Sequence, residues 1–170
     1  MILTVGVSFI LISFAYSIGL NVLFFSKKHV KNYETRLFSV FLPANFFGLL
    51  LEFCCSLAVG YYGITNTISV VLSKVFLIYL LFFLLLLLLY VYVICGSKDT
   101  VVELTNKQIK TRNIFIVLFI IVSIVDFLLP IQLKDSNGAM YSSGKATTFV
   151  YVISAIACLY CFVIFIMNTN

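Results

Sequence analysis

Three ionisable residues stand inside long apolar runs of this sequence, namely Glu52, Lys74 and Asp126. Charged groups are costly in hydrocarbon, so such residues usually pair with one another or mark a ligand, ion or proton pathway. Asn45, a polar residue in the same run as Glu52, joins them. These four are the intramembrane polar candidates that the sequence offers.

Lys74 and Asp126 each lie about four residues, or roughly 6 Å of helix rise, from the same side of their apolar runs. Antiparallel neighbouring helices would bring the two side chains level, which predicts a buried or half-buried ion pair. The alternative is that Lys74 extends to the interface and leaves Asp126 to find water or a hydroxyl. The sequence leaves both interpretations open.

Glu52 lies near the middle of its apolar run, roughly 16 Å from either interface by helix rise. A carboxyl group there is expected to keep its proton, because hydrocarbon disfavours the charged form. Asn45 precedes it by two helical turns on the same face, with Gly48 between them. This stripe predicts close approach of another helix with shared hydrogen bonds. A ligand or proton site is the alternative, and Asn21 in the preceding run belongs to the same class.

The sequence contains no complete catalytic, cofactor or metal motif. The only histidine, His29, stands in a basic segment without partners for a metal site. Cys158 and Cys161 form a C-x-x-C pair inside an apolar run without a nearby histidine, aspartate or third cysteine. We therefore interpret all five cysteines as small buried hydrophobic residues. Catalytic, cofactor-binding and metal-binding residues are not predicted, and whether the chain belongs to an enzyme stays open.

These residues are positioned by membrane-spanning helices. The chain is 63% hydrophobic and only 10% charged, whereas soluble domains carry roughly 25% charged residues. Runs of about 20 apolar residues suffice to cross a bilayer, and their continuity argues against the alternating strands of a β-barrel. We predict one all-α domain over residues 1–170, a bundle of five spans at 2–25, 39–62, 70–95, 114–130 and 148–167.

Shorter polar segments connect the predicted spans. Pro43 falls near the start of the second span, where a helix tolerates proline best. Within residues 96–113, the spacing of Val101, Leu104 and Ile109 predicts a short surface helix. Residues 131–147 carry two groups of turn-forming residues, which predict a loop.

The basic residues predict the orientation, because cytoplasmic loops are enriched in lysine and arginine. One set of loops carries eight of them, whereas the other side has three: Lys74, Lys134 and Lys145. This places the N-terminus outside the cell, the C-terminus in the cytoplasm and the protein in the plasma membrane. The net charge of +5 is dispersed over short loops, so nucleic-acid binding is not expected, and the lipid bilayer is the predicted partner.

Residues 21–28 (NVLFFSKK), 31–39 (KNYETRLFS) and 45–52 (NFFGLLLE) resemble the membrane input domain of a group of Firmicutes sensor histidine kinases. Residues 140–151 (MYSSGKATTFVY) are similar to the final extracellular loop of that group, with Lys145 where proline is common. Together these segments extend the resemblance over essentially the whole chain.

The resemblance implies a sensing and signal-transmitting domain of a two-component histidine kinase. Family members continue into a cytoplasmic dimerisation helix and an ATP-binding module, so it also implies a fragment, a possible sixth span and a homodimer formed through the absent module. A small transporter or transporter subunit is the alternative, with Glu52 and Asp126 as a proton path, and a membrane scaffold is another. The sensed ligand cannot be read from the sequence.

Overall fold

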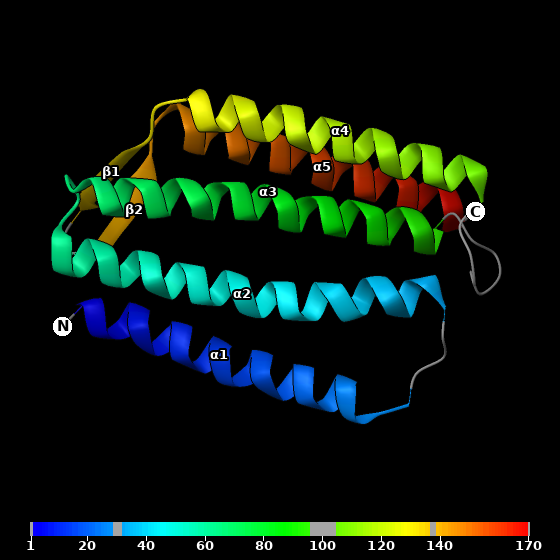
Figure 1. Ribbon diagram of the computed structural model, residues 1–170, viewed down its shortest axis with the longest axis horizontal. Coiled ribbons are helices and arrows are strands. Elements are labelled where there is room, and N and C mark those ends of the chain that lie inside the picture. The colour runs from blue at the N-terminus through cyan, green and yellow to red at the C-terminus, as the bar shows by residue number, and fades with distance from the viewer. Residues whose placement is uncertain (1, 29–31, 96–104, 137–138, 170) are drawn as a thin grey trace.

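The computed structural model describes residues 2–28, 32–95, 105–136 and 139–169. Within these ranges there are five long helices, each antiparallel to the one before it, and a small β-hairpin lies at one end (Figure 1). All five helices are long and apolar enough to cross a membrane. The predicted all-α bundle of five spans is therefore confirmed, and the chain is a multi-pass membrane protein.

The helices extend beyond the apolar runs from which they were predicted. In chain order they are α1 Ile2–Ser26, α2 Tyr33–Tyr62, α3 Thr67–Cys95, α4 Asn106–Leu128 and α5 Lys145–Thr169. The largest differences are at the starts of α2 and α4, predicted at residues 39 and 114. An apolar run marks only the part of a helix that hydrocarbon surrounds, so it ends before the helix does.

Side-chain caps set these two early starts. The Asn32 carboxamide oxygen accepts a hydrogen bond of 2.8 Å from the Thr35 amide and caps α2. Thr105 and Gln108 form a reciprocal capping box at the start of α4. Residues 106–113 are therefore the first turns of α4 and not a separate surface helix. Ile109 lies on α4, whereas Val101 and Leu104 fall outside the described residues.

Pro43 stands inside α2 and not near its start, because the helix begins at Tyr33. Membrane helices tolerate proline when neighbouring groups satisfy the polar backbone around it. Asn21 of α1 donates to the Leu42 carbonyl at 3.4 Å, and Tyr79 of α3 donates to the Ala44 carbonyl at 2.6 Å. These two bonds hold α1 and α3 against α2 beside the proline. The carbonyl that loses its helical N–H donor is that of Ser39, four residues before Pro43.

Helix α3 is the centre of the bundle, with α1 and α2 on one side and α4 and α5 on the other (Figure 1). Its residues Leu77 and Leu81 form the best-buried cluster together with Ala146 and Val150 of α5. Ala146 is 0% exposed, so the first turn of α5 lies directly against α3. Helix α1 packs on α2 through ring contacts such as Phe14–Phe46, whose centroids are 5.1 Å apart.

The segment between α4 and α5 folds into an antiparallel hairpin of β1 Gln132–Ser136 and β2 Ala139–Ser143. The sequence predicted only turns here, although Asn137-Gly138 between two short strands is a strong hairpin signal. Gly144 joins the hairpin to α5 with φ +109°, and a Cβ at this position would lie 3.2 Å from the Pro130 carbonyl oxygen. This junction therefore requires glycine.

Gly48 of α2 leaves room for the Tyr79 side chain of α3, because a Cβ on Gly48 would overlap the Tyr79 ring. We expect Gly48→Ala to displace Tyr79 from the Ala44 carbonyl and to lower the free energy of unfolding by about 1–3 kcal/mol. SDS titration in mixed micelles, followed by circular dichroism, measures this. Gly19→Ala is the matched control, since its Cβ meets open space. An equally small effect of both changes would contradict the predicted contact.

Candidate functional site

A cavity of about 240 Å³ lies under the hairpin, between α1, α2 and α3. It is the candidate functional site, because it combines an ionisable group with several other polar groups inside a membrane-spanning bundle. Its polar lining consists of Glu52, Cys55, Ser56, Ser73 and Ser142. Its apolar lining consists of Ile10, Val59, Phe76 and Leu133. We call this space the Glu52 cavity.

Helical and strand periodicity bring these residues together. The α2 members Glu52, Cys55, Ser56 and Val59 follow the i, i+3, i+4, i+7 spacing that places side chains on one helix face. From the hairpin, Leu133 of β1 and Ser142 of β2 are direct cross-strand partners. Cross-strand partners share a face of the sheet, so both point into the cavity.

Glu52 is the only charged residue among those that line the cavity. Its side chain is exposed, and the structure shows no hydrogen bond from it to a cavity hydroxyl among the described residues. The carboxyl group therefore faces open space. The serine hydroxyls can each donate or accept a hydrogen bond. The arrangement suits binding of a ligand with donor groups.

Glu52 lies ten residues, or roughly 15 Å of helix rise, before Tyr62, where α2 ends beside the hairpin. The three residues of the Asn45–Gly48–Glu52 stripe make different contacts. Asn45 donates to the Ser17 hydroxyl of α1 at 3.5 Å, and Gly48 accommodates Tyr79 of α3. Asn45 and Gly48 thus join helices, whereas Glu52 lines the cavity.

Lys74 does not form the predicted ion pair. Its Nζ atom donates a 2.7 Å hydrogen bond to the Phe127 carbonyl and lies 5.2 Å from the centroid of the Phe127 ring. Phe127 follows Asp126 on α4, so Lys74 and Asp126 lie level with each other along their helices, as predicted. The predicted partner is wrong, because neighbouring residues on a helix point about 100° apart.

Asp126 is 0% exposed, and neither of its carboxylate oxygens has a hydrogen-bond partner among the described residues. Within the same part of the chain, the hydroxyls of Ser123 and Thr147 are also buried without a partner. Asp126 belongs to α4, which lies on the opposite side of α3 from α1 and α2 (Figure 1), and it is not among the residues that line the Glu52 cavity. The structure therefore does not bring together the two carboxyl groups of the hypothetical proton path.

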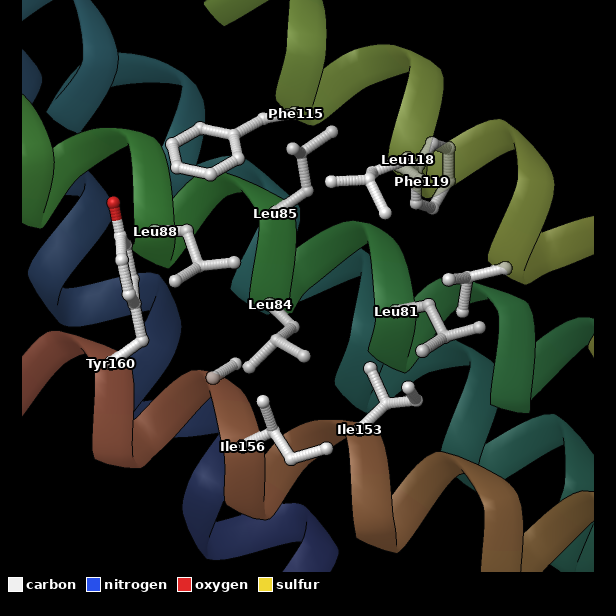
Figure 2. Close-up of a pocket in the computed structure, with 12 residues that line it drawn as sticks. Leu81, Leu84, Leu85, Leu88, Phe115, Leu118, Phe119, Ile153, Ile156 and Tyr160 are labelled. Atoms are coloured by element: carbon white, nitrogen blue, oxygen red, sulfur yellow. The ribbon is translucent and has the colours of Figure 1, made fainter. Parts of the chain in front are cut away.

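A second cavity of about 310 Å³ separates α4 from α5 over the surface of α3 (Figure 2). The labelled leucine, isoleucine and phenylalanine side chains converge on it, and Tyr160 closes one end against Phe115, with ring centroids 6.1 Å apart. Leu118 and Ile156 are at least half exposed, so the cavity opens on the outside of the bundle. Apart from the Tyr160 hydroxyl, its lining side chains are hydrocarbon and carry no chemistry.

The cysteines differ from the expected buried residues. All five are free, four are half-buried and Cys158 is exposed. A membrane helix can present a small apolar side chain to lipid as readily as to protein, so burial was not a necessary consequence of their position.

Sequence reasoning missed most of the cavity. Cys55, Ser56, Ser73 and Ser142 were not singled out, nor was the hairpin that covers them. The signal available for the α2 members was their helical spacing from Glu52. Tertiary packing places the hairpin over α1, α2 and α3, and no local pattern in the sequence predicts this position.

The chain matches no protein-family model, no curated protein and no solved structure. The resemblance to sensor kinase input domains therefore stays a prediction from the residues that carry it.

Because Lys74 bonds a carbonyl and not a carboxylate, its coupling to Asp126 should be weaker than that of a direct ion pair. We expect Lys74→Met to destabilise the protein by about 1.5–3 kcal/mol, the range for a hydrogen bond from a charged donor. In a double-mutant cycle with Asp126→Asn, the coupling energy should stay below about 1 kcal/mol. SDS titration of the four proteins gives this value. A coupling of about 3 kcal/mol or more would restore the ion pair.

Proposed function

We propose that this chain is a membrane-embedded sensing and signal-transmitting domain, of the kind that serves a bacterial two-component histidine kinase. The observation that carries the proposal is that the same hairpin lines the Glu52 cavity and leads directly into α5. Leu133 and Ser142 line the cavity, and Gly144 is the only residue between β2 and α5. A ligand in the cavity would therefore touch the element that begins the last helix.

The hairpin and the first turn of α5 are held together. The Ala146 amide donates a 3.3 Å hydrogen bond to the Pro130 carbonyl, across the base of the hairpin. Gly144 lies against the same carbonyl and against the Gln132 amide. A displacement of the hairpin should consequently move the start of α5 with it.

Helix α5 runs from the hairpin end of the bundle to the opposite end (Figure 1). Its buried residues Ala146 and Val150 pack against Leu77 and Leu81 of α3. Two alternative packings of this contact, one favoured by an occupied cavity, would give the two states that a signal requires. An output module at the far end would read the position of α5.

We further propose that the hairpin end faces outside the cell and that the membrane is the plasma membrane. Lys27, Lys28, Arg36, Lys110 and Arg112 lie at the end of the bundle away from the hairpin. Lys74, Lys134 and Lys145 lie at or near the hairpin end. The excess of basic residues at the far end supports its placement in the cytoplasm.

Single cysteines introduced at exposed positions test this orientation. In a chain without native cysteines, we expect Lys134→Cys to react with a membrane-impermeant maleimide in intact cells. Lys110→Cys, the matched control at the opposite end, should react only after permeabilisation. Labelling of the Lys110 position alone in intact cells would reverse the proposed orientation.

Cross-linking across the Glu52 cavity tests signal transmission. Ser56→Cys on α2 and Ser142→Cys on β2 place one thiol on each side of the cavity, in a chain without native cysteines and joined after residue 170 to a histidine kinase module. We expect a bifunctional thiol cross-linker to change autophosphorylation by at least about fivefold, because coupling between sites is typically 1–3 kcal/mol. Radioactive phosphate incorporation measures it.

The control is each single-cysteine protein treated with the same reagent, which should keep its original activity. Unchanged autophosphorylation of the fully cross-linked double variant would show that the hairpin does not transmit a signal.

A further inference from the structure

We propose that the Glu52 cavity binds an amphipathic amine, with its ammonium group beside Glu52 and its apolar body against the apolar residues of the lining. The inference deepens the proposed sensing function and rests on it for its biological meaning, whereas the binding can be measured by itself. It assigns a ligand class to a cavity that the sequence did not predict.

The charge of the lining selects the ligand headgroup. Glu52 is the only acidic side chain among the described residues that line the cavity, and its ionised form attracts a cation and repels an anion. An ammonium group carries three donors and no acceptor. Glu52 can accept one hydrogen bond, and the hydroxyl oxygens of Ser56 and Ser73 can accept the others. Hydrogen bonds between charged groups are roughly twice as strong as neutral ones.

The apolar half of the lining selects the body of the ligand. Phe76 and Val59 belong to the same cavity as the carboxyl group, and Leu133 lines it from the hairpin. A small hydrophilic cation would leave this surface without a partner, whereas an alkyl chain would cover it. The ligand that matches both halves is therefore amphipathic.

The size and the exposure of the cavity indicate how such a ligand lies. At about 240 Å³ it is slightly smaller than common drug-binding pockets of roughly 300–1,000 Å³. It holds the ammonium group and the first carbons of a chain. The Glu52 side chain is exposed, so the space around it opens at the surface of the bundle and the remaining chain can extend into lipid.

Cys55 provides a reporter inside the cavity, and Cys54 provides the matched control beside it. Both thiols are free and half-buried, but only Cys55 lines the cavity. The experiment compares two full-length proteins in nanodiscs, one with Cys55 as its single cysteine and one with Cys54. The rate of alkylation by N-ethylmaleimide is measured with dodecylamine, dodecanol or dodecanoate, which share one chain length and differ in charge.

At a concentration at which dodecylamine slows alkylation of Cys55 by at least about tenfold, we expect dodecanol to have little effect, because a charge-assisted hydrogen bond strengthens binding by about tenfold or more. Glu52→Gln should abolish this protection, and Ser73→Ala should reduce it. Alkylation of Cys54 should not change in any of these proteins, which also reports that each variant is folded. The neutral alcohol and the carboxylate should protect Cys55 less than twofold.

Equal protection by dodecanol and dodecylamine would overturn the proposal and would identify the cavity as a general hydrocarbon site. Protection that persists in Glu52→Gln would overturn it as well. The outcome is independent of the cross-linking experiment on Ser56 and Ser142: loss of amine binding with intact cross-link sensitivity rejects the ligand class alone, and the reverse rejects signal transmission alone.

Discussion

Hydrocarbon neither donates nor accepts hydrogen bonds, so a chain that crosses it must satisfy its polar backbone internally. Most features of this bundle depend on that constraint. The helices continue without interruption through the apolar runs and are capped by side chains outside them, as at Asn32 and Thr105. Beside Pro43, Asn21 and Tyr79 donate to the carbonyls of Leu42 and Ala44 and so join α1 and α3 to α2. The hairpin pairs its two strands at the end of the bundle.

The same constraint separates the intramembrane polar residues by what surrounds them. Asn45 and Lys74 donate to groups on neighbouring helices, so their polarity serves the fold. Asp126 is completely buried without a hydrogen-bond partner, and its position is costly in the charged form. Glu52 differs from all three, because it lines a cavity together with hydroxyl groups and an apolar surface. A polar side chain that lines a cavity and does not join two helices is the best candidate for binding a ligand.

The number and order of the helices could be predicted from the sequence, because a run of about 20 apolar residues has few alternatives in a bilayer. The early starts of α2 and α4 could also have been found, since Asn32 before Thr35 and Thr105 before Gln108 are recognisable caps. The partner of Lys74 could not be found. Depth in the membrane follows from residue counting, whereas the rotation of each helix about its axis follows from packing. The Glu52 cavity depends in addition on the hairpin folding over three helices, which no local pattern encodes.

Helix α5 is most deeply buried near the hairpin, where Ala146 and Val150 are almost fully buried. Farther along, Ala157 still packs into the bundle, and a cavity separates part of α5 from α4. With 25 residues, α5 is roughly 37 Å long at 1.5 Å per residue, so a tilt of roughly 5° about its first turns would move its far end by roughly 3 Å. In the proposed signalling role, a small movement of the hairpin would thereby become a larger displacement at the opposite end of the bundle.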